Sequence, residues 1–495
     1  MPKIPLGPWR PDAAVADNPG LVNVRNAIQA AGHWRAQPSL TAIGEQVITP
    51  PIQGLITVTR STGDFEMFLS FGGEIYRVPS ATAALVAVTD PDAPYGYSPS
   101  EFTRWRFAQY GDLLVATNFV DEVQGYDLVA GGTFAPLADP SGLVPRAKYL
   151  AVVKGFITLA YTQDDIDGED GFRVWWHGFL NGLPNPYDFT PDASTQADFQ
   201  RLSDVGTIAG ITGGEFGTIV GETGVVRQSF GDLLFRFDTV ERRIGSRVPN
   251  SIVQYRQLTF WWSPQGFAAF DGSSVRLIGV EKVDRWFADD FDEAFAHKMW
   301  TTTEGPRGHV LWLYCGRGHS GEPNRLLRYS VELDEWAVSD FEMQALGPGR
   351  TFSRSLDDAY FDNLDDPIHT NLDDPALWTS FPRLVGVAGN RIVSFGGPPL
   401  AATFEIGEVQ FGGEQARAML RKALVRGEGG ETTVSFVSRD RFNDTPRVSD
   451  AFVQQADGWH RFRVPGRSHR ARIVRSGAWV DTVDVTLIGE SLGNR

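Results

Sequence analysis

The stretch TIAGITGGEFGTIVGETGVVRQSF, residues 207–230, decides the fold class. Three runs of β-branched and apolar residues, 207–212, 216–221 and 225–230, are separated by glycine-containing turn signals. Short runs of this composition, joined through glycine turns, are typical of consecutive antiparallel strands. The stretch therefore predicts a three-stranded meander.

The same pattern recurs on both sides of this stretch. Hairpins are predicted at 65–71 with 74–78, 113–118 with 123–128, 258–263 with 266–270, 310–314 with 326–331, and 384–388 with 391–395. An aromatic residue marks the second strand of each hairpin, and the set is Tyr76, Tyr126, Phe270, Tyr329 and Phe395, with Trp176 and Phe230 as looser matches. Their spacing, roughly 40 to 65 residues, resembles the period of propeller blades. We therefore predict an all-β fold whose body, residues 51–400, is a β-propeller of about six or seven blades; a stacked β-sandwich is the alternative.

Three segments differ from these repeats. Residues 1–50 are rich in proline and lack alternation, so we expect an extended N-terminal arm that packs on another surface. Residues 401–495 predict a compact C-terminal β-domain, a sandwich, with strands near 405–411, 417–425, 432–438, 459–464, 469–474 and 483–489. Within the body, apolar residues recur every four positions at Phe287, Phe291 and Phe295, which predicts one amphipathic helix over 284–299.

Composition excludes several classes of protein. The chain has 61 acidic and 45 basic side chains and a net charge of −16, which disfavours a generic nucleic-acid coat. The single cysteine, Cys315, excludes an internal disulfide framework and a multi-thiolate metal site. No run of about 18 apolar residues is present, so no membrane span is predicted. Residues 1–11 lack the apolar segment of a secretory signal, and we expect a soluble product made in a cytoplasm.

No catalytic constellation is predicted. The glycine-rich run 210–214 lacks the lysine of a phosphate-binding loop. Residues 164–171 contain five carboxylates, the ligand type that Ca²⁺ prefers, but their spacing fails the EF-hand pattern. The acidic segment 357–375, with Asp365-Asp366 and Asp373-Asp374, is interpreted in the same way as a solvated loop. Whether the loops 164–170 and 357–375 bind Ca²⁺ stays open.

Two further sets of side chains were weighed as sites. His309, Cys315 and His319 are close in sequence, yet a zinc site needs further ligands at tight spacing. The carboxylates Asp238, Glu241 and Asp271 could serve a glycosidase only at a separation that sequence does not give. We therefore assign no catalytic, cofactor-binding or metal-binding residue and expect that the chain is not an enzyme.

The C-terminal domain carries a stripe of arginines: Arg461, Arg463, Arg467, Arg470, Arg472 and Arg475. Residues two apart on a strand share a face, so Arg461 should lie beside Arg463, and Arg470 beside Arg472. Arginine forms bidentate ion pairs, so the stripe could hold phosphate or the acidic surface of a neighbouring subunit. A merely solvated face is the alternative.

Several segments together resemble a group of tailed-bacteriophage virion proteins. They are Ala197–Gln200, Gly213–Gly217, Phe235–Asp238, Gly245, Gln265–Phe267, Phe270–Gly272, Ile278-Gly279 and Glu281–Phe287 in the body, with Trp9–Asp12, Asn23–Asn26 and Gln37–Leu40 in the arm, and Val464–Ile473, Gly477 and Trp479 near the end. The matches keep their order over most of the chain. More distantly, the group resembles the tail hub or nozzle of short-tailed phages, also called the packaged-DNA stabilisation protein.

The resemblance implies a structural role in the virion tail, with assembly in the cytoplasm of the host bacterium. It implies a ring, most simply a hexamer, below the portal and adaptor, with a channel through which double-stranded DNA passes during retention and ejection. It brings no catalytic residue with it. The net charge divides into −18 for residues 1–400 and +2 for residues 401–495, so we expect an acidic lumen that repels phosphate. A receptor- or glycan-binding propeller at the tail tip is the alternative, and a propeller glycoside hydrolase is a third.

Overall fold

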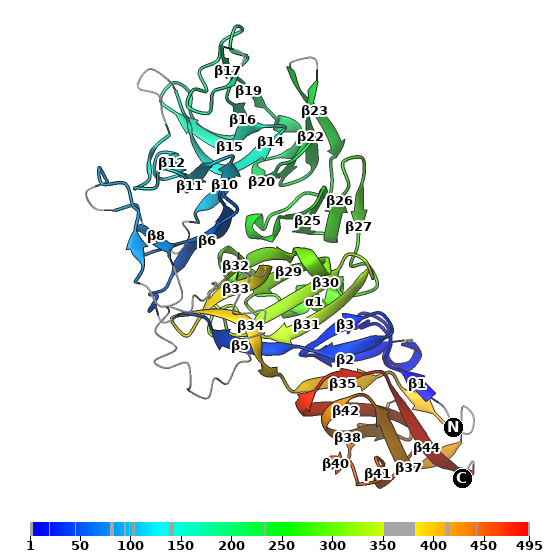
Figure 1. The fold of residues 1–495 in the computed structure, drawn as a ribbon. Coiled ribbons are helices and arrows are strands. Elements are labelled where there is room, and N and C mark those ends of the chain that lie inside the picture. The colour runs from blue at the N-terminus through cyan, green and yellow to red at the C-terminus, as the bar shows by residue number, and fades with distance from the viewer. Residues whose placement is uncertain are drawn as a thin grey trace, which may run out of the picture.

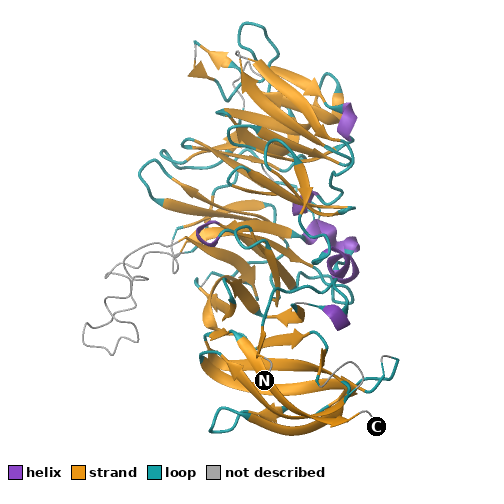
Figure 2. Cartoon of the chain, turned by 90° about the vertical axis from the view of Figure 1, so that its right-hand side faces the viewer, coloured by secondary structure: helices purple, strands orange, loops and turns teal. Residues whose placement is uncertain are grey.

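The structure is a computed structural model that describes residues 3–18, 20–44, 46–79, 84–93, 96–98, 100, 102, 104–137, 143–181, 183–231, 234–350, 382–411, 416–441 and 443–493. Strands dominate this part of the chain, with a single short α-helix and a few 3₁₀ turns (Figure 2). The all-β fold class predicted from the sequence is confirmed. The molecule has two parts, a ring of small sheets and a β-sandwich attached at one side of the ring (Figure 1).

Seven four-stranded antiparallel sheets form the ring, and we call them blades 1 to 7. Blade 1 contains β6 (Ile52–Thr59), β7 (Phe65–Phe71), β8 (Glu74–Val78) and β9 (Val86–Ala87). Blade 2 contains β10 (Arg106–Tyr110), β11 (Leu113–Thr117), β12 (Gln124–Asp127) and β13 (Ala135–Pro136). Blade 3 contains β14 (Arg146–Val153), β15 (Phe156–Asp164), β16 (Gly168–Trp176) and β19 (Asp198–Arg201). Blade 3 also carries the hairpin β17 (Phe179–Leu180) and β18 (Leu183–Pro184).

The remaining blades repeat the same order. Blade 4 contains β20 (Ile208–Thr212), β21 (Gly217–Gly221), β22 (Val225–Gly231) and β23 (Leu234–Glu241), and blade 5 contains β24 (Val253–Tyr255), β25 (Leu258–Ser263), β26 (Gly266–Phe270) and β27 (Val275–Leu277). Blade 6 contains β28 (Trp300–Glu304), β29 (His309–Tyr314), β30 (Arg325–Ser330) and β31 (Glu335–Asp340). Blade 7 contains β32 (Ala345–Arg350), β33 (Pro382–Ala388), β34 (Arg391–Pro399) and β5 (Pro38–Ala42).

The blades pack in sequence around a common axis. The first strand of a blade is the innermost one, because these strands contact each other from blade to blade: β10 with β14, β14 with β20, β24 with β28, β28 with β32, and β32 with β6. Apolar side chains fill the space between neighbouring blades, as where Phe68 of blade 1 lies 5.1 Å from Tyr126 of blade 2. This is the radial repetition of a β-propeller. All seven marker aromatics lie on the third strands of the seven blades.

The ring closes through a strand from the beginning of the chain. Blade 7 takes β32, β33 and β34 from residues 345–399, and its fourth strand is β5. The pairing is antiparallel and sets Ala42 opposite Val393. Backbone hydrogen bonds therefore join the two ends of the propeller, and blade 7 has four strands, as each of the other blades has.

The C-terminal part is a sandwich of two antiparallel sheets. We call the first sheet A; it runs in the order β1 (Lys3–Pro5), β44 (Asp484–Gly493), β37 (Arg417–Arg426) and β41 (His460–Gly466). Sheet B runs in the order β2 (Leu21–Arg25), β35 (Ala402–Ile406), β42 (Ser468–Trp479), β38 (Gly429–Arg439) and β39 (Arg447–Val448), with β36 (Val409–Gln410) and β40 (Phe452–Val453) at its sides. Their inner faces share a core that contains Leu420, Val425, Phe436 and Ile473.

The segment predicted to be an extended arm forms strands that pair within this chain. β1 extends sheet A, β2 extends sheet B, and β5 closes the propeller. Between them, β3 (Ala27–Ala30) and β4 (His33–Ala36) form a hairpin that adds β43 (Asp481–Thr482). Trp9 and Trp34 of this segment are buried in the common core. Its backbone edges are thus used by its own sandwich and propeller rather than left free for a neighbour.

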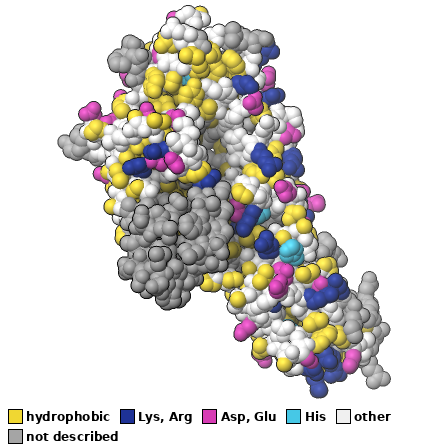
Figure 3. Space-filling view, in the orientation of Figure 1, with side chains coloured by type: hydrophobic (Ala, Val, Ile, Leu, Met, Phe, Trp, Pro, Cys, Tyr) yellow, Lys and Arg dark blue, Asp and Glu magenta, His cyan; other side chains and the backbone are white. Residues whose placement is uncertain are grey.

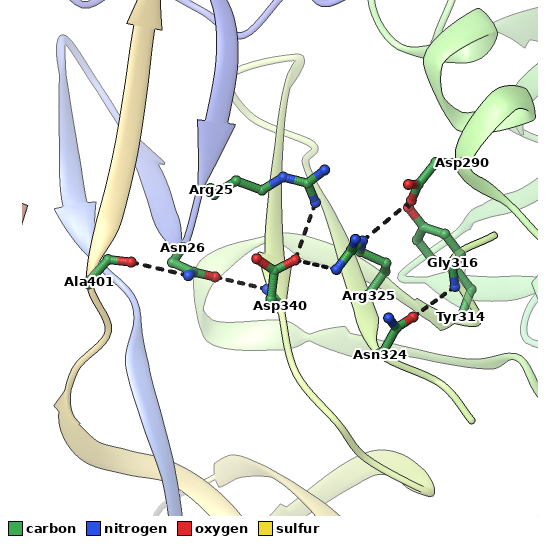
Figure 4. Close-up of polar contacts among 9 residues, drawn as sticks. All are labelled: Arg25, Asn26, Asp290, Tyr314, Gly316, Asn324, Arg325, Asp340 and Ala401. Carbon is green, nitrogen blue, oxygen red and sulfur yellow. Dashed lines mark hydrogen bonds and ion pairs between the residues drawn. The ribbon is translucent and has the colours of Figure 1, made fainter. Parts of the chain in front are cut away.

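A chain of polar contacts, which we call the seam, fixes the propeller against the arm and the sandwich (Figure 4). Asp340 of β31 forms ion pairs with Arg25 at 3.3 Å and Arg325 at 2.6 Å, and its backbone N–H donates to the Asn26 side chain. Asn26 also donates to the Ala401 carbonyl, directly before sheet B. Since φ of Asn26 is 59°, the backbone turns sharply between β2 and β3 at this point.

The helix predicted over 284–299 is broken. α1 covers Asp284–Asp290, and a separate 3₁₀ segment covers Glu293–Lys298. Phe291 between them has extended backbone angles, since it forms a bridge with Gly316, and the Asp292 carboxylate accepts the N–H of Ala294 to begin the second segment. The buried aromatic face was predicted, but the carboxylate cap and the bridge to blade 6 end the helix early.

Candidate functional site

The innermost strands all begin at one mouth of the propeller. Because they run in the same direction around the axis, the residues at their first positions converge there. Arg106 is the first residue of β10 and Trp300 the first of β28. Arg104, Asn250 and His297 lie shortly before β10, β24 and β28. Side chains from blade 2 thus face side chains from blades 5 and 6 across the axis.

Direct contacts join these residues across the mouth. Arg104 Nη2 donates to the His297 carbonyl at 3.1 Å, and its guanidinium lies 3.8 Å from the centre of the Trp300 ring. Arg106 Nη2 donates to Asn250 Oδ1, and Asn250 Nδ2 donates to the same His297 carbonyl at 2.6 Å. Cations above aromatic faces are stabilised by the ring quadrupole. The arrangement holds both guanidiniums at the axis in fixed positions.

A third cation continues the row from blade 3. Lys148, on β14, has its Nζ 4.9 Å from the Tyr161 ring centre and 5.8 Å from the Tyr149 ring centre. Arg106 lies 5.9 Å from the Tyr149 ring centre, so Tyr149 stands between the two cations. We call Arg104, Arg106 and Lys148 the axial cation row.

None of the three members of the axial cation row forms a direct ion pair with a carboxylate among the described residues, although the Glu169 carboxylate lies near enough to Lys148 to oppose the lowering of its pKa. Burial lowers the pKa of Arg104 well below its usual value, and the neighbouring Arg106 lowers it further. Burial also lowers the pKa of Arg106 and of Lys148, and Arg106 again contributes to the shift at Lys148. Both arginines are nevertheless half-buried and Lys148 is exposed, so solvent reaches the row. Three positive charges therefore repel one another in a confined but accessible space.

A pocket of about 310 Å³ opens beside Arg104. Four blades contribute to its wall, through Ile52, Arg104, Trp300 and Gln344. Lys298 and Glu322 also line it and form an ion pair at 2.9 Å. This volume is at the lower end of the range for small-molecule sites. Its wall combines apolar surface with a guanidinium held in place by Trp300.

The contacts across the mouth also restrict the propeller axis. Hydrogen bonds of Arg104 and Arg106 bridge blade 2 to the residues before blades 5 and 6. A double helix cannot follow an axis that side chains bridge within hydrogen-bonding distance. The propeller axis therefore has no room for a double helix at this mouth.

The outer face of sheet A is the second charged feature. Its outward positions carry Lys3, Arg417, Arg421, Lys422, Arg426, Arg461 and Arg463. Figure 3 shows Lys and Arg side chains gathered at the end of the sandwich that is farthest from the propeller. Lys422 stands directly opposite Arg461 in the register, and like charges in that position destabilise a sheet.

Some of these cations have counter-ions and others do not. Arg421 pairs with Glu490 at 2.9 Å, Arg417 pairs with Asp440, and Arg461 pairs with Asp457. The buried Asp484 serves both Lys3 at 3.3 Å and Arg426 at 2.8 Å. Lys422 and Arg463 form no ion pair with any residue that the structure describes. We call this outward surface the basic face of sheet A.

The predicted arginine stripe is divided between several environments. Arg461 and Arg463 share the basic face as expected from their spacing, and both are exposed. Arg470 pairs with Glu405 at 2.6 Å, and Arg472 is exposed on sheet B. Arg475 is buried and donates to the Glu428 and Gly429 carbonyls, so it holds a backbone corner of the sandwich. The stripe is therefore not one continuous surface.

Three carboxylates of the acidic loop 164–170 form ion pairs with arginine side chains. Asp164 and Arg173 form a fully buried ion pair at 2.5 Å, and Arg173 also reaches Asp167 at 3.4 Å. Asp170 pairs with Arg201 at 2.8 Å. Within the described residues no group of three or more His, Cys, Asp or Glu side chains is placed to hold a metal ion. The segment 357–375, with its paired aspartates, lies outside the described residues.

The other side chains weighed as sites are not brought together. His309 begins β29 and contacts Glu304 and Arg328, whereas Cys315 follows the far end of the same strand and is buried. A six-residue strand separates them by about 20 Å. Glu241 accepts the N–H groups of Arg242 and Arg243.

Asp271 and the glycine-rich run 210–214 likewise have structural roles. Asp271 accepts the N–H groups of Ser273 and Ser274, which lowers its pKa to about 2, while Asp238 is exposed on β23. At Gly213 an added Cβ would lie 2.1 Å from the Val152 carbonyl oxygen, so this glycine permits the close approach of blades 3 and 4.

Sequence reasoning missed the axial cation row. The only local signal is the alternation Arg104-Trp105-Arg106 at the start of a strand, which sets two cations on one face. Nothing in that pattern shows that the facing acceptors, 144 and 193 residues later in the chain, are the neutral Asn250 amide and the His297 backbone carbonyl rather than carboxylates.

Comparison with known proteins gives no family. No family model matches the chain, and no curated protein matches it. Among solved structures, the computationally designed Ika8 protein has a TM-score of 0.32 at 12% identity, over 72% of this chain and 98% of that protein. The extracellular domain of the putative one component system BT4673 from B. thetaiotaomicron has a TM-score of 0.37 at 8% identity, over 85% of this chain and 47% of that one.

A third solved structure is the β-propeller domain of Cps50 (Swd1) from Myceliophteria thermophila, with a TM-score of 0.26 at 11% identity, over 50% of this chain and 89% of that one. Because all three TM-scores are below 0.5, the propeller is defined here by its own strand order and register. None of the helices in the described part of the chain has the length and apolar character needed to cross a bilayer.

Proposed function

We propose that this chain is a structural component of a bacteriophage tail, a nozzle or tail hub, whose copies associate head to tail into a ring. The observation that carries the proposal is the segregation of charge: the basic face of sheet A belongs to a chain whose residues 1–400 carry a net charge of −18. Contact between the basic face of one copy and the acidic propeller of the next is heterologous, and such contacts form a ring when the rotation between neighbouring copies closes. The sequence resemblance to tail proteins supports a hexamer below the portal and adaptor.

Two cations make the basic face an interface candidate rather than a solvated surface. Lys422 stands opposite Arg461, and Arg463 adds a further charge on the same strand. A repulsive pair costs stability in the isolated chain, whereas an acidic partner would turn the same charges into an attraction. The proposed partner is the propeller of an adjacent copy.

The same proposal places the DNA path between copies. The propeller axis is bridged by Arg104 and Arg106, so a ring of copies, not the single propeller, would surround the duplex. An acidic inner surface of that ring would repel phosphate and let DNA slide. The role in the virion is then retention and release of packaged DNA, without sequence-specific binding and without catalysis.

The alternative of a receptor-binding or glycan-binding tip has less support. Sugar-binding surfaces present exposed aromatic rings, and in the described residues the exposed large aromatic side chains are Phe102 and Tyr187, which belong to blades 2 and 3. The hydrolase alternative has less support still, because Glu241 and Asp271 cap their own turns.

The test is assembly of the purified full chain. Native mass spectrometry and light scattering at low salt are expected to give a closed oligomer that dissociates as ionic strength rises, and electron microscopy should show a ring. The double variant Lys422→Glu/Arg463→Glu should shift the equilibrium to monomer. Arg472→Glu is the matched control, since Arg472 is an exposed arginine on sheet B.

Two outcomes would overturn parts of the proposal. A chain that stays monomeric at all protein and salt concentrations contradicts the ring. A double variant that assembles like the wild type, at the same ionic strength as the control, removes the basic face of sheet A as the interface.

A further inference from the structure

We propose that the axial cation row of Arg104, Arg106 and Lys148 is a binding site for a small multivalent oxyanion of the phosphate class. The site lies at the propeller mouth, on the inner strands of blades 2 and 3. It is separate from the basic face of sheet A and does not depend on ring assembly.

The first argument is that neither guanidinium, of Arg104 or of Arg106, has a carboxylate counter-ion among the described residues. Two other buried arginines have one: Arg173 pairs with Asp164 at 2.5 Å, and Arg328 pairs with Glu304 at 2.7 Å, whereas the buried Arg475 has its donors occupied by the Glu428 and Gly429 carbonyls. The axial cation row instead meets a carbonyl oxygen, an amide oxygen and three aromatic faces. An unpaired charge in a confined space is strongly destabilising, and a bound anion removes that cost.

The second argument is the capacity that the guanidiniums retain. A guanidinium has five N–H donors. The hydrogen bonds that Arg104 and Arg106 make to described residues use the Nη2 nitrogen of each. The remaining donors can form the bidentate contacts that phosphate oxygens favour, while Lys148 supplies a point charge from the neighbouring blade.

The third argument is access and rigidity. Solvent reaches all three side chains, and a pocket of about 310 Å³ lies directly beside Arg104. Trp300 and Asn250 fix the two guanidiniums, so little side-chain freedom is lost when a ligand binds. Strands at the centre of a closed ring provide a stiffer frame than surface loops do.

The charge of the row selects the ligand class. A single carboxylate would neutralise only one of three cations, whereas pyrophosphate or a longer polyphosphate carries several negative charges in a compact volume. The site therefore favours di- and triphosphate groups over monovalent anions. The phosphate could be free or could end a larger molecule, and the experiment separates these sources.

Calorimetric titration of the full chain provides the test, with pyrophosphate, tripolyphosphate, malonate and a short 5′-phosphorylated oligonucleotide as probes. We expect one site per chain, tighter binding of tripolyphosphate than of malonate, and weaker binding at higher salt. Arg106→Gln should weaken pyrophosphate binding at least tenfold. Arg463→Gln, which removes an exposed cation on sheet A, should bind as the wild type does.

Stability without ligand distinguishes a lost site from a lost fold. Removing an unpaired cation should leave the thermal midpoint of Arg106→Gln equal to or above that of the wild type. If this variant does not fold, Lys148→Met gives the same binding test at an exposed position. Absence of binding at millimolar pyrophosphate, or equal affinity in Arg106→Gln and Arg463→Gln, would overturn the proposal. Binding of the oligonucleotide but not of the free polyphosphates would also overturn it, in favour of a nucleic-acid end.

Discussion

Replacement of Trp34 by alanine should destabilise the molecule as a whole, although the residue belongs to the N-terminal segment. Trp34 on β4 is fully buried, its ring centre lies 6.0 Å from that of Phe404 on β35, and its Nε1 donates to the Leu6 carbonyl at 3.1 Å. It belongs to one apolar core that also contains residues of blades 5 and 6 and of both sandwich sheets. The segment is thus a structural part of the sandwich.

The size of the effect follows from burial and hydrogen bonding. Truncation of a buried tryptophan to alanine costs about 3–5 kcal/mol through lost transfer energy and the cavity left behind. Trp34→Phe keeps part of the ring packing, but it loses the N–H donor and leaves a smaller cavity, so the expected cost is about 1–3 kcal/mol. Both values are changes in the free energy of unfolding.

Equilibrium urea unfolding, followed by circular dichroism, measures both variants against the wild type. The matched control is Tyr187→Ala, because Tyr187 is an aromatic residue with 44% of its surface exposed. We expect the order of stability to be control, Trp34→Phe, then Trp34→Ala. A loss for Trp34→Ala below about 1 kcal/mol, equal to that of the control, would refute the conclusion that the segment is integral to the core.

Three further outcomes are expected. Burial raises the pKa of Asp284 to about 6 from 3.8, so the folded state binds this proton more tightly than the unfolded chain does, and stability falls as pH rises between these values. Asp284→Asn should therefore be more stable than the wild type at about pH 7.5, with the difference vanishing near pH 4 in urea titrations; an equal difference at both pH values would contradict this. Arg173→Met leaves the Asp164 carboxylate buried without its ion pair and should cost about 3–5 kcal/mol, most of it restored in the double variant with Asp164→Asn; additive losses in that cycle would argue against a coupled pair. Burial raises the pKa of the Cys315 thiol to about 12, so a maleimide should label it slowly in the native protein and rapidly in urea, and equal rates would show that it is accessible.

The parts of the fold that could be predicted are those with local signals. The second and third strands of the blades were recognisable, as in β25 and β26, because glycine or proline turns join runs of aromatic and β-branched residues. Most first strands, such as β6, and the short outer strands, such as β9, lack a turn signal of their own and were missed; β20 is an exception, because it lies in the predicted meander. Their positions depend on blade packing, which is a tertiary property.

The strands with which the N-terminal segment pairs could not be predicted from the sequence either. Composition indicated an extended chain at residues 1–50, and extended strands are present, but β1 pairs with β44 and β2 with β35, hundreds of residues away. No local pattern specifies such a partner. The candidate site has the same origin, because Arg104 and Asn250 become neighbours only through closure of the ring.

The pairing of β5 with β34 has a consequence for synthesis. Ala42 and Val393 are separated by about 350 residues, which take roughly 20–70 s to translate. Throughout that interval the first strands leave the ribosome without the partners that cover Trp9, Leu21 and Trp34. The propeller therefore cannot close until the last blade has been synthesised. During that time the apolar side chains of the nascent N-terminal segment are exposed to aggregation unless another protein covers them.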